Sequence, residues 1–179
     1  MKKLLYICVL LFVGSLSAQE INWMTFDEAL AAQEKNPKKI IVDAYTTWCG
    51  PCKLLDRNTF GNKEVADFIN ENYYAVKFNA EGTEEINYLD NVYTNPGHDP
   101  SRRGRNSPHE FTQAMKLRGY PSIVFFDEKG AYIQPVVGYK TPRQLEIYLK
   151  MIANDDYKDL TTQEKWQAYQ DGFEYTFGK

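Results

Sequence analysis

The sequence predicts an α/β protein in which a central mixed sheet is flanked by helices. Two apolar runs rich in β-branched residues, 39–46 and 74–79, indicate buried strands. More than twenty residues separate these runs, which is enough for a helical crossover and therefore predicts a parallel pair. Two later runs, 122–126 and 132–137, flank a turn at 127–130 and predict an antiparallel hairpin. A sheet that contains both kinds of pair is mixed.

Helix-start signals lie between the predicted strands. Thr25 and Glu28 have the spacing of a capping box, and the helix that they begin should end near Asn36-Pro37. The other expected caps are Asn62, Ser107 and Thr141, the last two each followed by proline. Apolar positions at helical spacing give these four helices their expected inner faces: Phe26, Ala29 and Leu30; Val65, Phe68 and Ile69; Phe111, Ala114, Met115 and Leu117; Leu145, Leu149 and Ile152.

Two segments depart from this alternation of strands and helices. Residues 80–107 are polar and rich in turn signals, which predicts a surface excursion, and apolar residues at helical spacing predict a helix over 83–93 within it. The helix that begins at Ser107 should end at Gly119, so the whole helical insertion covers about 80–118. After Asp155-Asp156 a last helix is expected, whose packing stripe consists of Trp166, Tyr169 and Phe173.

The first eighteen residues have the layout of a secretory signal peptide. A basic start, Met1-Lys2-Lys3, precedes a ten-residue apolar run that is too short for a permanent membrane span, and small residues follow up to Ala18. Removal of 1–18 leaves 161 residues, enough for one domain. We expect one domain at 19–155 with a helical extension at 156–179 packed on it. The mature protein should be exported, periplasmic or secreted, and should not span the membrane.

Charge and composition exclude some classes of partner. The chain of 179 residues carries 21 basic and 24 acidic residues, and loss of the leader leaves a formal charge of −5. That balance argues against nucleic acid as a partner. A zinc site is disfavoured, because His98 and His109 are the sole histidines and neither has ligand spacing to the cysteines. We therefore expect a monomer without metal or cofactor.

The motif Cys49-Gly50-Pro51-Cys52 is the strongest chemical signal in the chain. It follows the first predicted strand directly, and residues 53–58 after it indicate a helix, so Cys49 falls at a helix N-terminus. Unpaired backbone N–H groups and the helix dipole stabilise a thiolate there, and a thiolate is the nucleophile of disulfide exchange. The third cysteine, Cys8, lies in the leader. A mature exported protein that keeps two cysteines three positions apart uses them for chemistry rather than for stapling.

These positions predict separate roles for the two cysteines. Cys49 is the expected nucleophile, and Cys52 resolves the mixed disulfide from the next helical turn by forming the Cys49–Cys52 disulfide. Cys49 should be the more exposed and the more acidic thiol. The alternative is an inert structural disulfide, whose short loop would constrain little of the unfolded chain.

Asp43 and Lys77 are charged residues in otherwise apolar strands. Burial would raise the pKa of Asp43 towards neutrality, which suits a proton acceptor for Cys52. The alternative reading is a structural acid that is simply paired with Lys77.

The order of these residues resembles the thioredoxin superfamily over about 20–153. The matching features are the cysteine pair, Asp43 six residues before Cys49, Lys77 in the next strand, Tyr120-Pro121 before the hairpin and Gly138 after its last strand. The resemblance implies a thioredoxin fold and a catalytic set of Cys49, Cys52, Asp43 and Pro121 with Lys77 as an auxiliary residue. A cis bond at Pro121 would place the Tyr120 backbone beside Cys49. The implied substrate-binding residues are Trp48, Gly50, Pro51, Tyr120 and Gly138.

Three departures favour one branch of the superfamily. Arg57 stands where many thioredoxins have a helix-kinking proline, the 80–107 excursion is long, and the tail after 155 has no thioredoxin counterpart. The chain is therefore more similar to the secreted thioredoxin-like reductases, which resemble the soluble domains of bacterial transmembrane electron-transfer proteins. That resemblance implies disulfide-bearing exported proteins as substrates and a membrane-embedded electron donor.

Several alternatives stay open at this point. The same fold hosts disulfide oxidases and isomerases, and it could also serve as a peptide-binding module without catalysis. Trp48 could shield the thiols at the rim of the site or belong to the core. The basic segment Arg102-Arg103-Gly104-Arg105 could steer an acidic partner or be an ordinary solvated loop.

Overall fold

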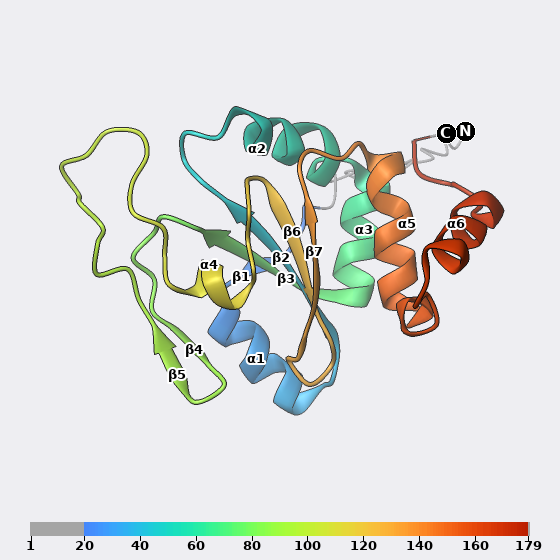
Figure 1. The fold of residues 1–179 in the computed structure, drawn as a ribbon, viewed down its shortest axis with the longest axis horizontal. Helices are drawn as coiled ribbons and strands as arrows, with labels where there is room; N and C mark the ends of the chain where they lie inside the picture. The colour runs from blue at the N-terminus through green and yellow to red at the C-terminus, as the bar shows by residue number, and fades with distance from the viewer. Residues whose placement is uncertain (1–19, 179) are drawn as a thin grey trace, which may run out of the picture.

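A five-stranded mixed sheet forms the centre of the computed structural model, which describes residues 20–178 (Figure 1). The expected leader at 1–18 and Cys8 lie outside the described residues. The strands follow the order β1 (Trp23–Met24), β3 (Tyr73–Asn79), β2 (Lys39–Tyr45), β6 (Ser122–Phe126) and β7 (Tyr132–Val137). β3 pairs in parallel with β1 and β2, whereas β6 pairs antiparallel with β2 and β7. The predicted mixed sheet is confirmed.

Helices cover both faces of this sheet (Figure 1). One face carries α1 (Phe26–Lys35) and the short α4 (Phe111–Ala114), and the other carries α2 (Gly50–Leu55), α3 (Lys63–Asn72) and α5 (Pro142–Ala153). α2 continues directly into a π-helical turn, η1 (Asp56–Phe60). The expected caps for α1, α3 and α5 are present: Thr25 and Thr141 form complete capping boxes, and Asn62 accepts a hydrogen bond from the backbone of Val65.

The central strand β2 explains how the sheet positions charged groups. All but its last residue are buried, and alternate side chains point to opposite faces. Ile40, Val42 and Ala44 enter the core beneath α1, whereas Ile41 enters the core beneath α3 and α5. Asp43 has the same parity as Ile41, so it points to the face that carries α2. Its parallel partner in the register of β3 is Lys77.

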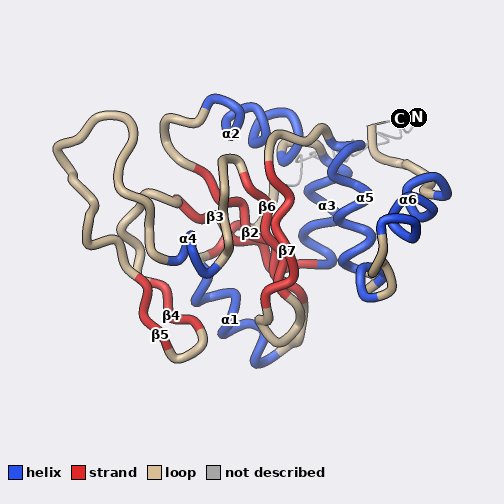
Figure 2. The backbone as a smooth tube through the Cα atoms, viewed as in Figure 1, coloured by secondary structure: helices blue, strands red, loops and turns tan. Residues whose placement is uncertain are grey.

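The helix expected over 83–93 is not formed. This segment is a hairpin of β4 (Ile86–Tyr88) and β5 (Asn91–Tyr93), and the rest of the excursion is mainly loop (Figure 2). Leu89 and Asp90 both have positive φ, as the two central residues of a type I′ hairpin turn do. Helix α1 holds the hairpin in place, because the Asp27 side chain of α1 accepts two hydrogen bonds from Asn87. The insertion is therefore not helical in this part.

The helix expected from Ser107 to Gly119 is much shorter than predicted. α4 covers Phe111–Ala114 and has no side-chain cap, because the expected capping groups are engaged elsewhere. Glu110 accepts a hydrogen bond from the backbone of Thr94, and the buried His109 uses both ring nitrogens in backbone hydrogen bonds. These tertiary contacts thus override the local sequence signal for a helix start at Ser107.

The C-terminal segment contains η2 (Asp156–Lys158) and α6 (Gln163–Gly172). Trp166 and Tyr169 of α6 pack half-buried against the core, and Phe173 contacts Tyr169. The residue that enters the core from this end is Phe177, which lies beyond α6 and which the sequence patterns missed. None of the helices formed by residues 20–178 has the length and apolar character needed to cross a bilayer.

Candidate redox site

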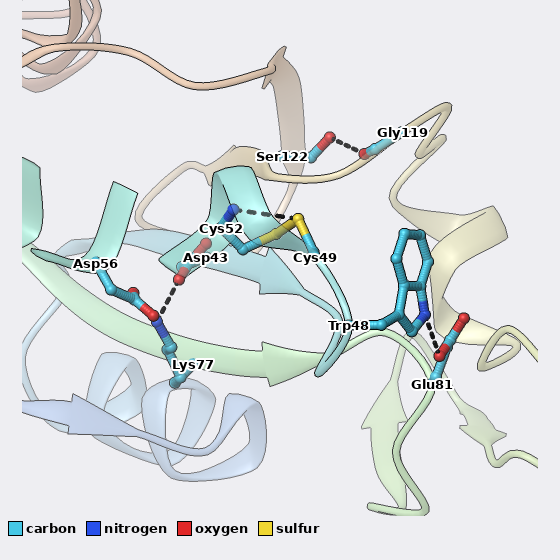
Figure 3. Close-up of a disulfide and its surroundings, with 9 residues drawn as sticks. All are labelled: Asp43, Trp48, Cys49, Cys52, Asp56, Lys77, Glu81, Gly119 and Ser122. Carbon is cyan, nitrogen blue, oxygen red and sulfur yellow. Dashed lines mark hydrogen bonds and ion pairs between the residues drawn. A yellow bond between two sulfur atoms is a disulfide. The ribbon is translucent and has the colours of Figure 1, made fainter. Parts of the chain in front are cut away.

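Cys49 and Cys52 form a disulfide at the start of α2, immediately after the loop that follows β2 (Figure 3). Cys49 occupies the N-cap position, and the backbone N–H of Cys52 donates to its sulfur at 3.1 Å. The same donor would stabilise a Cys49 thiolate after reduction, together with the positive end of the helix dipole. The expected difference in exposure is wrong for this disulfide state, because both residues are 2% exposed. The expected roles of Cys49 as nucleophile and Cys52 as resolving thiol are therefore inferred from their positions in the helix.

The residues between the cysteines form the outer edge of the site. Gly50 and Pro51 are both exposed, and Pro51 lies in the first turn of α2, where a missing backbone N–H is tolerated. A side chain at position 50 would meet no atom within 4 Å. The outer edge of the motif therefore faces solvent, although the two cysteines are themselves buried.

Asp43 lies behind the disulfide with its side chain pointing from β2 towards Cys52 (Figure 3). It is 1% exposed, and one carboxylate oxygen accepts a hydrogen bond from Lys77 Nζ at 2.5 Å. The other oxygen, Oδ1, has no hydrogen-bond partner within residues 20–178. Burial raises the pKa of Asp43 to about 6, although the Lys77 ammonium acts in the opposite direction. A buried carboxylate with one unoccupied oxygen and a near-neutral pKa is suited to accept a proton.

Asp56 is a site residue that the sequence reasoning missed. It begins η1, and its carboxylate forms a second ion pair with Lys77, so this ammonium bridges a buried and a half-exposed acid. Burial would lower the pKa of Lys77, but the two carboxylates raise it above its ordinary value. Asp56 stands four residues after Cys52, a spacing that places two residues on the same side of a helix. This spacing was the sequence signal that could have identified Asp56 as a site residue.

A cavity of about 440 Å³ lies beside the ion pair of Lys77 and Asp56. It is lined by Asp56 and Lys77 together with Glu20, Ile21, Trp23, Phe60 and Gly61. The Lys77 ammonium lies 5.0 Å from the ring centroids of both Trp23 and Tyr45, which hold it in place between the acids. Lys77 therefore connects Asp43 to a solvent-facing space.

The loop before β6 approaches the motif from the other side. The Tyr120–Pro121 peptide bond is cis, and the Pro121 carbonyl accepts a hydrogen bond from the backbone of Gly138 at 2.8 Å. Gly138 has a φ of 85°, a region that a side chain would disfavour. The loop is also closed by Ser122, whose hydroxyl donates to the carbonyl of Gly119 at 2.7 Å (Figure 3).

Trp48 forms the rim of the site next to Cys49 and is 36% exposed. Its indole N–H donates to the carboxylate of Glu81 at 2.8 Å (Figure 3). Its ring meets the Tyr120 ring edge-on. The guanidinium of Arg105 lies 4.4 Å from the centre of the Trp48 ring. The excursion therefore contacts the site through Glu81 and Arg105, neither of which the sequence patterns placed there.

The two histidines of the excursion form hydrogen bonds that stabilise its loops. His98 and His109 each place a ring nitrogen at hydrogen-bond distance from a backbone carbonyl, of Glu81 and Glu84 respectively. Among the described residues, no three His, Cys, Asp or Glu side chains gather as a metal-ligand set.

A dithiol pair at a helix start, backed by a buried acid on a mixed sheet of this order, defines a thioredoxin-fold redox protein. The family model described as a thioredoxin-like domain matches residues 26–153, and the chain belongs to this family. The match begins with α1, includes the strands β2, β3, β6 and β7 of the central sheet, and ends with α5. These features together support a thiol-disulfide oxidoreductase.

Individual relatives agree with this placement. The thiol:disulfide interchange protein DsbD of Pseudoalteromonas atlantica is 28% identical over 112 residues, which are 63% of this chain and 15% of that protein. The chain spans 15 to 17% of the length of the DsbD relatives that it matches.

Two solved structures are similar in fold. A thioredoxin-fold protein from Helicobacter pylori has a TM-score of 0.57 at 19% identity, with 81% of this chain and 94% of that chain covered. A candidate disulphide isomerase from Bacteroides thetaiotaomicron has a TM-score of 0.51 at 27% identity, with 76% of this chain and 93% of that chain covered.

Proposed function

We propose that this protein reduces disulfides in exported proteins through a cycle of the Cys49–Cys52 pair. The observation that carries the proposal is the combination of a nearly enclosed disulfide at a helix start with the buried Asp43 carboxyl directed at Cys52. A structural disulfide would need no proton acceptor, whereas a resolving thiol does.

The reduced protein would act in two balanced steps. The Cys49 thiolate attacks one sulfur of a substrate disulfide, and the other substrate sulfur leaves as a thiolate that takes up a proton. The Cys52 thiol then gives its proton to Asp43 and attacks the Cys49 sulfur, which releases the second substrate sulfur as a thiolate that takes up a proton. Two protein thiols become one disulfide while one substrate disulfide becomes two thiols.

Trp48, Tyr120 and the backbone on either side of Pro121 form the surroundings in which a substrate segment would bind. Tyr120 and Gly138 lie on the two loops that close one side of the motif, and Gly50 with Pro51 leaves the other side open. An extended substrate segment could pair with the backbone of the Tyr120 loop as an added strand. This arrangement suits protein disulfides better than small ones.

Continued turnover requires two electrons for each disulfide reduced. The leader expected at 1–18 would place the protein outside the cytoplasm, where an oxidising environment does not regenerate thiols. A membrane-embedded reductase that carries electrons across the membrane is therefore the proposed donor. The similarity to proteins named for thiol–disulfide interchange supports exchange with another protein thiol pair.

Oxidation or isomerisation of substrate disulfides is the second candidate function. Its specific support is the 27% identity to the candidate disulphide isomerase of Bacteroides thetaiotaomicron. The same thiol chemistry would run in that case, with the direction set by the reduction potential of the pair.

Turnover of a protein disulfide by cysteine variants tests the proposed function. We expect the wild-type protein, supplied with dithiothreitol, to accelerate insulin reduction, and Cys49→Ser to abolish that acceleration because it lacks the nucleophile. Cys52→Ser should form a stable mixed disulfide with substrate, visible by mass spectrometry and released by reductant.

The outcomes separate the competing functions. Trapping through Cys52 in a Cys49→Ser variant, with none in Cys52→Ser, would reverse the assigned roles. Binding of unfolded protein that persists after both cysteines are changed to serine, without any wild-type turnover, would indicate a non-catalytic binding module instead.

A further inference from the structure

The excursion carries a loop that is built against the rim of the redox site. The Glu81 carboxylate fixes the indole of Trp48, and the backbone carbonyl of Glu81 lies 2.9 Å from a ring nitrogen of His98. Asn106 closes the loop, because its side chain donates to the carbonyl of Asp99 and accepts from the backbone N–H of the same residue. The loop is thus held in a defined position next to Cys49.

Residues 99–106 of this loop carry three arginines and one acidic residue, Asp99, whose pKa is lowered by hydrogen bonds from Ser101 and in part by the charge of Arg102. Arg102, Arg103 and Arg105 are all exposed, and within residues 20–178 none of their guanidinium groups forms an ion pair or a hydrogen bond. Arg105 lies over the Trp48 ring, which orients the planar group while leaving its N–H donors available. Trp48 in turn directly precedes Cys49.

The local charge is opposite in sign to that of the whole chain, which has a formal charge of −3. At physiological salt, charges more than about 8 Å apart are largely screened, so Arg105, which lies over the ring of Trp48 beside Cys49, is the arginine positioned to act on a substrate segment there. An arginine that is held by an aromatic ring binds a carboxylate through two parallel hydrogen bonds and loses little side-chain freedom in doing so.

We propose that Arg102, Arg103 and Arg105 form a specificity surface, here called the basic rim, for protein disulfides flanked by aspartate or glutamate. The inference rests on the proposed function, since it names the substrate class of the same cysteine pair. In the complex, an acidic side chain near the attacked substrate cysteine lies against Arg105 and Trp48. The neighbouring arginines attract the acidic segment during encounter.

Two peptides of equal length, each with one internal disulfide, provide the test. One has glutamates on both sides of the cysteine that is attacked and the other has lysines at the same positions. kcat/KM is measured for each peptide and divided by the value of the same protein with bis(2-hydroxyethyl) disulfide, a small uncharged substrate. The variants are Arg105→Gln, Arg105→Lys and the triple change of all three arginines to Gln.

A matched control is available in α5, outside the excursion. Arg143, at the start of α5, also lies 4.4 Å from an aromatic ring, that of Tyr175. Arg143→Gln removes one positive charge and one arginine–aromatic contact without touching the basic rim.

We expect the wild-type protein to prefer the glutamate peptide, and Arg105→Gln to reduce that preference about three- to fivefold. The triple variant should reduce it about tenfold or more, and 0.5 M salt should have a similar effect on the wild type. Arg105→Lys should keep part of the preference, because it retains the charge but not the planar donor group. Arg143→Gln should leave the ratio at the wild-type value.

Equal rates on both peptides, unaffected by the basic-rim variants or by salt, would contradict the proposed role of the basic rim in substrate selection. The proposal of disulfide reduction would be unaffected by that result. An equal loss from Arg143→Gln would overturn the role of the basic rim too, since net charge alone would then explain the preference. A wild-type protein that reduces neither peptide nor the uncharged disulfide would contradict the proposed function itself, and the basic rim with it.

Discussion

Replacing Asp43 by Asn is expected to slow protein-disulfide turnover at pH 7 by about tenfold or more, because Cys52 loses its proton acceptor. Asn has the same shape but cannot take up the thiol proton. The wild-type rate should fall as pH decreases through about 6, where the carboxylate becomes protonated, and Asp43→Asn should lack this dependence. Insulin-reduction rates above pH 7 equal to those of the wild type would leave Asp43 as a structural acid.

The same substitution should stabilise the oxidised protein above pH 6. The pKa of Asp43 is raised in the folded state, so its contribution to stability is complete below about pH 3.8 and is lost as pH rises through about 6. At pH 7 the buried charge therefore lowers the free energy of unfolding by about 2–3 kcal/mol relative to pH 4. Asp43→Asn should raise Tm by about 5–10 °C at pH 7 and by much less at pH 4.

Variants of the two neighbouring charges check that Asp43 is the titrating group. The Asp56 carboxylate raises the pKa of Asp43 and the Lys77 ammonium lowers it. A carboxyl-carbon NMR titration of the oxidised protein should therefore show a lower Asp43 pKa in Asp56→Asn and a higher one in Lys77→Met. Shifts in the same direction in both variants would contradict the assignment.

Replacing Glu146 by Ala is expected to destabilise the protein by about 3 kcal/mol or more. Glu146 of α5 is fully buried and holds the C-terminal segment, because its carboxylate accepts hydrogen bonds from the backbone N–H groups of Thr176 and Phe177 and from Lys150. Its removal leaves the buried backbone N–H of Phe177, and the partly exposed donors of Thr176 and Lys150, without this acceptor. Denaturant unfolding measures the loss, and hydrogen exchange at Thr176 and Phe177 should become faster.

Glu64 provides the matched control for this prediction, because its carboxylate accepts a hydrogen bond from Gly178 in the same tail but at an exposed position. Glu64→Ala should therefore change stability by less than about 1 kcal/mol. Burial alone would raise the pKa of Glu146, but its hydrogen bonds hold it below the ordinary value of 4.5. The stabilisation is then present above about pH 4.5 and is lost as pH falls below it. Equal, small effects of the two substitutions would show that Glu146 does not anchor the tail.

The parts of the fold set by local patterns could be predicted from the sequence. β2, β3 and the hairpin of β6 and β7 follow from apolar runs between turn residues, and the caps Thr25, Asn62 and Thr141 lie where polar side chains meet the start of an apolar stripe. The placement of Asp43 beside Lys77 follows from the period of a strand and the parallel register. These features depend on neighbours in the sequence.

The missed features depend on contacts between distant segments. Ile86 and Tyr93 have helical spacing, whereas Ile86 and Tyr88 alternate with an exposed residue as in a strand. The contact with Asp27 and the turn at Leu89 select the hairpin. The predicted helix cap at Ser107 does not form because the Glu110 side chain accepts a hydrogen bond from Thr94, sixteen residues earlier. Asp56 and Arg105 reach the site through contacts with Lys77 and Trp48. The spacing from Cys52 was a signal for Asp56, whereas no spacing along the chain reveals the contact of Arg105. β1 has two residues, too few for any pattern.

The reduction potential of the Cys49–Cys52 pair tests the reductase proposal most directly. The protein would be equilibrated in dithiothreitol and glutathione redox buffers, its free thiols alkylated, and the reduced fraction determined by mass spectrometry. The Gly50-Pro51 sequence between the cysteines resembles that of reducing family members, so we expect a potential near that of thioredoxin, about −270 mV. A value between about −180 and −120 mV, as in isomerases and strong oxidants, would contradict reduction as the physiological direction.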